Sequence, residues 1–484
     1  MHRLFRARAC RHSLEAVLLC VLPWGISLTY AQDGGEDVLD PQLNERVLNI
    51  PVSGPPPAEL QVTFFRPNGP GPFPLAVLNH GKEHGRPREE KRYRSAYAAR
   101  YFLSRGYAVV LPMMRGFAGS GGETWIKGCD AESEGIKQAR DVSQVIAYMA
   151  AQSDLGTKID PNRVVVFGQS LGGWNTLAFG TLNVPGVKGL ANFAGVRNAP
   201  MCASWQKDLA IAAGHYGAQT QVPSIWFYGD NDSRSPAPTW REMHQRYSAA
   251  GGQVELVAYG RFMRDSHNFL GQIEALPIWI PRMDAFLARI GLPSQNLHPE
   301  LLPAPYPAPT HFAAIDAIAA LPLVDDNGRK SYEAFLQKPM PRVFAIAADG
   351  STFSTDGGYD PLARVQAMCK ERNRRCQIYA VDDQVVWPKA LPVPPATQFA
   401  KLEEVAAVPY LNQAGRQSYR RFLTLPRPRA FVVAPDGAWA FSARDFDVQK
   451  SALQSCAQKH QGCRVYAIDD QVVWPEAADK AAVR

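Results

Sequence analysis

The sequence predicts an α/β domain with a mostly parallel central sheet, followed by two small α+β repeat domains. Short β-rich runs alternate with amphipathic helical stretches between about residues 45 and 290, and this alternation is typical of a parallel sheet with helices on both faces. The second prediction rests on an internal duplication, because the C-terminal region repeats the same residues at a constant offset of 87 positions.

The predicted elements of the first domain follow each other in a regular order. Six runs have the length and composition of strands: Leu75–Asn79, Tyr107–Leu111, Arg163–Phe167, Val187–Phe193, Ser224–Tyr228 and Val254–Tyr259. Five stretches carry helical patterns: Arg92–Ser104, Glu132–Ala151, Gly173–Leu182, Thr239–Ala249 and Leu276–Ile290. Two earlier runs, Arg46–Pro51 and Leu60–Arg66, are expected to be antiparallel edge strands.

The N-terminus has the composition of an export signal. Four arginines within the first 11 residues precede an apolar run from Ala16 to about Leu28, and Ala31 lies near the expected cleavage site. The run contains Pro23 and Gly25 and is short for a bilayer. We interpret residues 1–31 as a signal peptide, with an uncleaved membrane anchor as the alternative. The sequence therefore predicts a secreted or periplasmic protein with no stable membrane insertion.

Charge and cysteine content narrow the class further. The formal net charge of +7 falls to +4 without residues 1–31, and no basic run is interleaved with aromatic residues, so nucleic acid is not an expected partner. Six of the eight cysteines follow the signal, and none has the CxxC spacing of a metal site. We predict three disulfides: Cys129–Cys202, Cys369–Cys376 and Cys456–Cys463. For the first pair, the alternative is two free buried thiols.

The domain boundaries follow from composition and from the duplication. Residues 32–291 form the first domain, and the proline-rich residues 292–312 form a linker. Repeat 1 (residues 313–388) is followed by a second linker (residues 389–399), repeat 2 (residues 400–475) and a tail (residues 476–484).

The sequence of each repeat predicts a strand, an Asp-Gly turn, a short helix and a second strand. The motif Asp-Asp-Gln-Val-Val-Trp-Pro begins at Asp382 in repeat 1 and at Asp469 in repeat 2. A solvated strand end explains its Asp-Asp pair more simply than a cation site does. Core packing is the simpler interpretation of Trp387 and Trp474, and stacking on a sugar is the alternative. Neither copy contains a catalytic constellation.

The strongest chemical signal is the segment Gly168-Gln169-Ser170-Leu171-Gly172. A β-rich run leads directly into it and a helical pattern follows. In a G-x-S-x-G turn between a strand and a helix, the glycines allow close backbone packing while the serine hydroxyl is lifted above the sheet. We therefore predict that Ser170 is a nucleophile. The alternative is a chance match, since the bare pattern is short.

A serine nucleophile needs a base that is oriented by an acid, and at such a turn these follow the serine along the chain. Asp232 lies in the loop after the run Ser224–Tyr228, and His267 lies in the loop after the next run. We predict Asp232 as the acid, with Asp230 as the less favoured choice, and His267 as the base. A turn-capping aspartate and an ordinary surface histidine are the structural alternatives.

The same chemistry requires N–H donors for an oxyanion. We predict the backbone N–H of Leu171 and, in the loop after the run Leu75–Asn79, the N–H of Lys82; His80 is expected to position that loop. The glycine-rich residues 115–122 are expected to form a wall of the cleft rather than a phosphate loop. Trp174, Trp125 and Trp205 are candidates for lining the pocket, although each would fit equally well in the core.

Taken together, these motifs resemble the dienelactone-hydrolase-like branch of the α/β-hydrolases, over about half of the chain. The resemblance rests on five segments: His80-Gly81, Arg115 to Gly122, Gly168 to Gly173, Gly229 to Asp232 and His267-Asn268-Phe269. It implies an α/β-hydrolase fold and a Ser-His-Asp triad. Dienelactone hydrolases carry cysteine where this chain has Ser170, a departure that favours esters over lactones. The C-terminal repeats resemble no family that we can name.

The predicted function is hydrolysis of carboxylic esters through an acyl-enzyme, with no metal and no cofactor. The substrate is expected to be a small-molecule or polymer-borne ester. Two alternatives remain: a serine peptidase or amidase of prolyl-oligopeptidase-like type, and a non-catalytic envelope- or carbohydrate-binding protein with a vestigial hydrolase domain. For the repeats, a cell-surface or carbohydrate target is a further hypothesis.

Overall fold

A computed structural model describes residues 39–54, 56–83, 85–152, 158–388 and 392–475. The predicted signal peptide (residues 1–31) and the tail (residues 476–484) lie outside the described residues, as does part of the second linker. The N-terminal domain is described first and the two repeats after it, each by itself.

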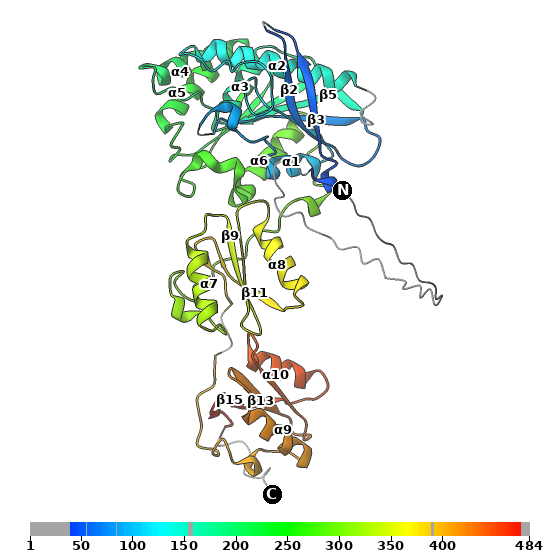
Figure 1. Ribbon diagram of the computed structural model, residues 1–484, viewed down its shortest axis with the longest axis vertical. Coiled ribbons are helices and arrows are strands. Elements are labelled where there is room, and N and C mark those ends of the chain that lie inside the picture. The colour runs from blue at the N-terminus through cyan, green and yellow to red at the C-terminus, as the bar shows by residue number, and fades with distance from the viewer. Residues whose placement is uncertain (1–38, 55, 84, 153–157, 389–391, 476–484) are drawn as a thin grey trace, which may run out of the picture. The chain divides into compact units, whose positions relative to one another are not determined.

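The N-terminal domain is built on an eight-stranded sheet (Figure 1). In sequence the strands are β1 Arg46–Val52, β2 Ala58–Phe65, β3 Phe73–Asn79, β4 Ala108–Pro112, β5 Ile159–Gln169, β6 Val187–Phe193, β7 Ser224–Tyr228 and β8 Val254–Ala258. In space their order is β1-β2-β4-β3-β5-β6-β7-β8, and all neighbours from β4 to β8 are parallel. This confirms the predicted mostly parallel sheet.

One expectation about the first two strands is wrong. Both are antiparallel, as predicted, but β2 pairs with β1 on one side and with β4 on the other. Only β1 therefore lies at the edge of the sheet. The alternating burial of β1 agrees with an edge position, whereas the second half of β2 is continuously buried.

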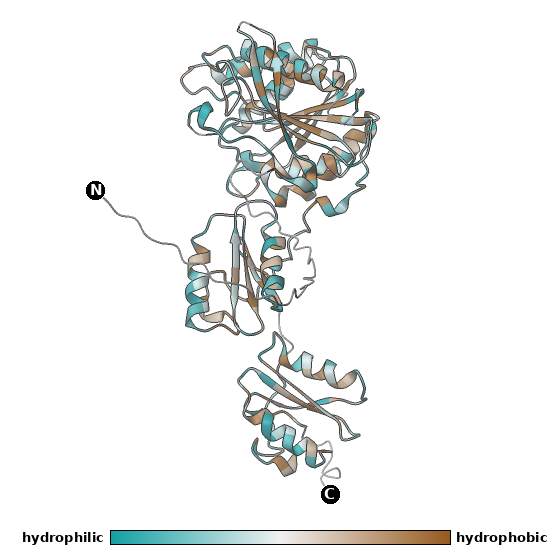
Figure 2. Cartoon of the chain, turned by 45° about the vertical axis from the view of Figure 1, so that its right-hand side comes forward, coloured by the Kyte–Doolittle hydropathy of each residue, from teal (hydrophilic) through white to brown (hydrophobic). Residues whose placement is uncertain are grey.

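Helices cover both faces of this sheet (Figure 1). Their bounds are α1 Ala96–Leu103, α2 Ala131–Ala151, α3 Leu171–Gly180, α4 Trp205–Gln219, α5 Ala237–Ala249 and α6 Leu276–Arg289. Helices α2 to α5 bury their apolar side chains in one hydrophobic core, and α1 and α6 contribute to a second core. The strands between these cores are apolar on both faces (Figure 2), which is the pattern of a covered parallel sheet.

Helix α4 is the one long element of this domain that the sequence analysis missed. Its sequence, rich in alanine with glycines at positions 214 and 217, lacks a strong apolar stripe. Tight packing explains this composition, because a Cβ added at Gly217 would lie 2.3 Å from the carbonyl oxygen of Tyr247 on α5.

The proline-rich linker is not a free spacer at its start. Leu292 is buried, and the hydroxyl of Tyr107 donates a hydrogen bond to the carbonyl of Pro293. The N–H groups of Leu297 and His298 both donate to the carbonyl of Ser104. Residues 292–298 therefore extend the packing of the N-terminal domain.

The two repeats share one fold of two helices on a four-stranded antiparallel sheet. Repeat 1 contains α7 Asp326–Leu336, β9 Arg342–Ala347, β10 Thr352–Asp356, α8 Pro361–Glu371, β11 Cys376–Val381 and β12 Gln384–Val385. Repeat 2 contains α9 Gln413–Leu423, β13 Arg429–Val433, β14 Trp439–Ala443, α10 Val448–Ala457, β15 Arg464–Ile468 and β16 Gln471–Val472. The strand orders, β10-β9-β11-β12 and β14-β13-β15-β16, correspond strand for strand. The sequence analysis missed the first helix and the second and fourth strands of each copy.

Equivalent hydrogen bonds stabilise the fold within each repeat. The N–H of Arg342 donates to Asp382, and its guanidinium donates to the carbonyls of Phe335 and Lys338 at the end of α7. Arg429 and Asp469 make the corresponding contacts in repeat 2. Asp382 is buried, so the prediction of a solvated strand end is wrong for this residue. Trp387 and Trp474 are also buried, in the cores of their repeats.

The structure contains the three predicted disulfides, Cys129–Cys202, Cys369–Cys376 and Cys456–Cys463. In each repeat the bridge ties the second helix to the strand that follows it. Three disulfides in one chain indicate an oxidising, extracellular environment. Over the described ranges, every helix is too short or too polar to cross a membrane.

Short 3₁₀ helices connect several elements: η1 Pro41–Leu43, η2 Pro87–Glu89, η3 Ser266–Gly271, η4 Ile273–Ala275, η5 Pro299–Leu301, η6 Ile318–Ala320 and η7 Val405–Ala407. The third of these contains the predicted base.

Candidate active site

Ser170 occupies the sharp turn between β5 and α3. Its backbone has φ 57° and ψ −124°, a conformation that non-glycine residues rarely adopt and that is associated with functional sites. The neighbouring glycines are required by close contacts. A Cβ added at Gly168 would lie 2.3 Å from the carbonyl oxygen of Gly172, and one added at Gly172 would lie 2.0 Å from that of Asn79. The turn therefore has the geometry that the sequence motif predicts.

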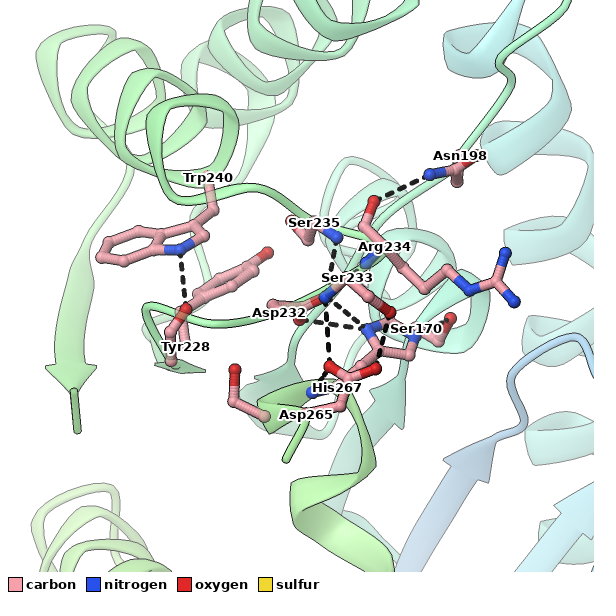
Figure 3. Close-up of polar contacts among 12 residues, drawn as sticks. Ser170, Asn198, Tyr228, Asp232, Ser233, Arg234, Ser235, Trp240, Asp265 and His267 are labelled. Carbon is pink, nitrogen blue, oxygen red and sulfur yellow. Dashed lines mark hydrogen bonds and ion pairs between the residues drawn. The ribbon is translucent and has the colours of Figure 1, made fainter. Parts of the chain in front are cut away.

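The structure brings Ser170, His267 and Asp232 together (Figure 3). The Nε2 atom of His267 lies 2.8 Å from the Oγ of Ser170. On the other side of the ring, Nδ1 lies 2.9 Å and 3.0 Å from the two carboxylate oxygens of Asp232. In this arrangement Nδ1 donates to the carboxylate, and Nε2 is left to accept the serine proton.

The side chain of Asp232 is fixed in place by its own loop. Its side chain is fully buried, and Oδ1 accepts hydrogen bonds from the N–H groups of Arg234 at 2.8 Å and Ser235 at 2.7 Å. The other candidate, Asp230, is exposed and forms an ion pair with Arg241 at 2.6 Å. Of the two carboxylates, Asp232 is the one that contacts the imidazole.

The loop of His267 is fastened to the elbow as well as to the acid. The side-chain Nε2 of Gln169, the residue before the nucleophile, donates to the carbonyl of His267 at 2.6 Å. On the N-terminal side, the N–H of His267 donates to the carboxylate of Asp265 at 2.9 Å. The sequence analysis did not single out Gln169 or Asp265. The sequence did contain a signal for Asp265. An aspartate directly before a helical turn often accepts a hydrogen bond from a backbone N–H of that turn, here that of His267.

The predicted oxyanion loop lies against the nucleophile. A Cβ added at Gly81 would be 3.1 Å from the Cβ of Ser170, so the chain just before Lys82 passes next to the serine side chain. Leu171 is the first residue of α3, and the first N–H groups of a helix have no partner inside it. Gly81, which precedes Lys82, and Leu171 thus lie beside Ser170, and the two N–H donors stay a prediction.

His80 positions this loop. Its Nε2 accepts a hydrogen bond from the N–H of Met114 at 2.9 Å, and its Nδ1 donates to the carbonyl of Gly81 at 2.6 Å. Burial lowers the pKa of His80 to about 4, outweighing the opposite effect of the Gly81 carbonyl. The ring is therefore neutral at physiological pH and links the oxyanion loop to the segment after β4.

The glycine-rich residues 115–122, which follow β4, are anchored by Arg115. Arg115 is buried and donates to both carboxylate oxygens of Asp141 on α2, at 2.7 Å and 3.0 Å. Next to it, Met113, Met114, Phe117 and Leu171 form a small apolar cluster. This cluster gives the nucleophile an apolar neighbour on its α3 side.

The Cys129–Cys202 disulfide joins the loop after β4 to the loop after β6. Close to it, the Nε of Arg197 donates to Glu134 at 2.8 Å, and Nη2 donates to the carbonyl of Gly128 at 2.9 Å. The other Glu134 oxygen accepts from the N–H of Gly128. A disulfide and a buried ion pair thus brace two loops at the carboxyl edge of the sheet.

The structure places the three tryptophans that were candidates for the pocket in different surroundings. Trp174 is completely buried, and its Nε1 donates to the carbonyl of Ala131 at 2.8 Å, so it belongs to the core and does not line a pocket. Trp125 packs beside the guanidinium of Arg115, and its Nε1 lies 3.4 Å from Asp141. Trp205 begins α4 and packs against the core.

Four other described histidines have other surroundings. His215, His298 and His460 pair with Glu132, Glu300 and Asp436. His244 stacks edge-on against Trp226. Among the residues placed by the structure, no group of three or more His, Cys, Asp or Glu side chains could hold a metal ion.

A cavity of about 410 Å³ lies beside the oxyanion loop. Its lining combines His80, Gly81, Tyr93 and Met113 with seven charged side chains: Glu83, Arg86, Glu89, Glu90, Lys91, Arg92 and Arg94. Burial raises the pKa of Glu90 to about 7. The lining therefore combines charged groups with apolar surface.

Comparisons with known proteins agree with the hydrolase geometry. The family model of X-Pro dipeptidyl-peptidase (S15 family) matches residues 56–256, a range that includes Ser170 and Asp232 and ends before His267. No curated protein matches the chain.

Three solved structures are similar to about half of this chain. A Klebsiella pneumoniae protein provisionally assigned as a dienelactone hydrolase has 17% identity and a TM-score of 0.36, covering 51% of this chain and 98% of its own. A Pyrococcus furiosus esterase has 15% identity and a TM-score of 0.37, with 52% and 92% covered. The Pyrococcus horikoshii acylaminoacyl peptidase has 15% identity and a TM-score of 0.39, with 51% and 41% covered. The strand order and the elbow identify the N-terminal domain as an α/β-hydrolase fold.

Proposed function

We propose that the N-terminal domain is a serine hydrolase that cleaves carboxylic esters through an acyl-enzyme. The observation that carries the proposal is the continuous hydrogen-bonded chain from the Oγ of Ser170 through His267 to Asp232. A hydroxyl in contact with an imidazole, which is itself oriented by a buried carboxylate, is the arrangement that nucleophilic acyl transfer requires.

The reaction follows from the positions of these atoms. As Oγ of Ser170 bonds to the ester carbonyl carbon, its proton moves to Nε2 of His267, and the N–H groups of Leu171 and Lys82 face the oxyanion. Collapse of this intermediate breaks the bond to the alcohol, which takes the proton from Nε2. Water then attacks the acyl-enzyme while His267 again accepts a proton, and the acid leaves as Oγ is reprotonated.

We propose that the acyl group enters the cavity beside the oxyanion loop, where the charged side chains favour a short or polar group. A long alkyl chain placed there would remove water from several charged side chains between positions 83 and 94 without offering them new partners, which is unfavourable. Acetyl or similar groups would fit beside Met113 and Tyr93 without that cost. We therefore propose that turnover falls as the acyl chain lengthens.

A peptidase is the second candidate function, and the family match favours it. Residues 56–256 match the X-Pro dipeptidyl-peptidase model, and the same triad can cleave an amide when the leaving amine is protonated by His267. The two functions differ in the substrate they recognise and not in the reacting atoms.

One comparison of substrates tests both functions. Purified protein is given a short-chain aryl ester and an X-Pro aryl amide at equal concentrations, with Ser170→Ala as the control. The ester proposal expects kcat/KM at least about tenfold higher for the ester and loss of this activity in the control. Faster amide turnover would establish the peptidase. Equal, residual rates for wild type and control would favour a non-catalytic binding role.

We further propose that the protein is exported. The predicted signal at residues 1–31 and the three disulfides support this proposal. Cell fractionation should recover a shortened chain outside the cytoplasm with its six remaining cysteines blocked to alkylation. A full-length, reduced cytoplasmic protein would contradict it.

A further inference from the structure

The side chain of Asp265 connects His267, the predicted base, to the loop that carries Asp232, the predicted acid (Figure 3). One of its carboxylate oxygens, Oδ1, accepts hydrogen bonds from the N–H of His267 at 2.9 Å and from the N–H of Ser233 at 3.1 Å. The other, Oδ2, accepts from the hydroxyl of Ser233 at 2.6 Å. Ser233 directly follows Asp232, so a single carboxylate connects the two loops.

The loops that Asp265 connects are 32 positions apart in the chain and follow different strands, β7 and β8. Their alignment sets the distances along the chain of hydrogen bonds from Asp232 to Ser170. Gln169 adds a second fastening, because it donates to the carbonyl of the same histidine at 2.6 Å. Both backbone polar groups of His267 are therefore bound by side chains, one from its own loop and one from the elbow.

The contacts of Asp265 favour its charged form. Its partial burial on its own would raise its pKa, but the hydrogen bonds from Ser233 and from the N–H of His267 outweigh burial and hold the pKa below the usual value. Hydrogen bonds to an ionised acceptor are stronger than neutral ones. The connection between the loops is consequently in its strong form throughout the neutral pH range.

We propose that Asp265 is a positioning residue that holds the imidazole of His267 in line between Ser170 and Asp232. The inference rests on the proposed function. Because Asp265 contacts the histidine backbone and not its ring, it would act through geometry alone. Misplacement of a catalytic group by about 1 Å can reduce a rate about a hundredfold, so a small rotation of the loop is enough to matter.

Two substitutions at position 265 separate geometry from general stability. Asp265→Ala removes all three hydrogen bonds, and we expect kcat for the short-chain ester to fall about 10- to 100-fold, with KM within about twofold. Asp265→Asn keeps an oxygen for the two N–H groups and places an amide N–H toward the Ser233 hydroxyl, which can accept. We expect this variant to keep kcat within about threefold of wild type.

Ser233 provides the matched test of the link. In Ser233→Ala the Oδ2 contact is lost while the contact with His267 remains, and kcat should fall less than in Asp265→Ala. The double variant should be no slower than Asp265→Ala, because both changes remove the same link. Asp230 carries an exposed carboxylate on the acid loop and is paired with Arg241. Its replacement in Asp230→Ala should leave kcat unchanged.

The rate of labelling by a fluorophosphonate distinguishes failure of this inference from failure of the proposed function. If wild type takes no label, the proposed serine hydrolase is contradicted. If wild type is labelled and Asp265→Ala is labelled at the same rate, only the positioning role is overturned. The same holds if Asp265→Asn is as slow as Asp265→Ala while both remain folded. If Asp265→Ala fails to fold, Ser233→Ala, Asp265→Asn and their double variant take its place. Losses of kcat that add up in the double variant would overturn the positioning role.

Discussion

The N-terminal domain and the C-terminal repeats both bury charged side chains, but these side chains have different partners. In the repeats, Arg342 and its counterpart Arg429 bind the backbone carbonyls that end the preceding helix, and both copies make the same contacts. In the N-terminal domain, Asp232 and His267 come from separate loops, and the imidazole between them contacts the hydroxyl of Ser170. Polar groups that bind nearby backbone stabilise a fold, whereas polar groups from several strand ends that form one chain of hydrogen bonds to a serine hydroxyl indicate chemistry.

The largest expected effect tests the acid. Asp232→Asn would let the histidine adopt the wrong tautomer, and kcat should fall by about 10³ to 10⁴ in steady-state ester hydrolysis. Asp230→Asn changes an exposed aspartate two positions earlier in the same loop. It is the matched control and should change kcat by less than about twofold. Equal losses in both variants would show that the buried carboxylate has no special role.

A smaller effect is expected in the repeats, and it should concern stability alone. Arg342→Ala would leave several helix-end carbonyls without a donor, and the free energy of unfolding of repeat 1 should fall by about 3 to 4 kcal/mol. Calorimetry and ester turnover of the same sample measure both quantities. Arg429→Ala should lower the stability of repeat 2 by a similar amount. A fall in kcat at a temperature where the repeats stay folded would contradict the division between the two regions.

The smallest effect concerns His80 and depends on pH. The unfolded chain binds a proton on this histidine near its ordinary pKa of 6.5, whereas the folded protein does so only near pH 4. Stability should therefore be complete above pH 6.5 and should fall by about 3 kcal/mol as the pH decreases to 4. Urea unfolding at several pH values measures this slope.

A variant isolates this contribution of His80. His80→Gln keeps an acceptor for the Met114 N–H and does not titrate, so its unfolding free energy should lack most of the slope between pH 6.5 and 4. An unchanged slope in the variant would assign the pH dependence to other groups.

Much of the site could be predicted from sequence because its signals are local. The strand, glycine-flanked turn and helix around Ser170 lie within a short segment, and the loops of Asp232 and His267 follow neighbouring parallel strands whose carboxyl ends share one edge. Chain order alone therefore brought the right side chains together. The sequence favoured Asp232 over Asp230, but both follow the same strand, and the structure shows that Asp232 is the one in contact with the imidazole.

Other features depend on packing between distant segments and had no local signal. Helix α4 is small-residue-rich because α5 packs closely against it, so its pattern is weak. Trp174 is one turn from the nucleophile in sequence, yet its side chain points into the core beneath α2. The contact between Asp265 and Ser233 joins two loops whose separation is set by the sheet, and no spacing rule in the chain encodes it.

The central claim is that Ser170 is a nucleophile activated by His267. Treating the folded protein with a fluorophosphonate and locating the adduct by peptide mass spectrometry tests it most directly. The account predicts one adduct, on the peptide that contains Ser170, and a rate of labelling that collapses in His267→Ala. An adduct on another serine, or labelling of Ser170 that is unaffected by His267→Ala, would contradict it.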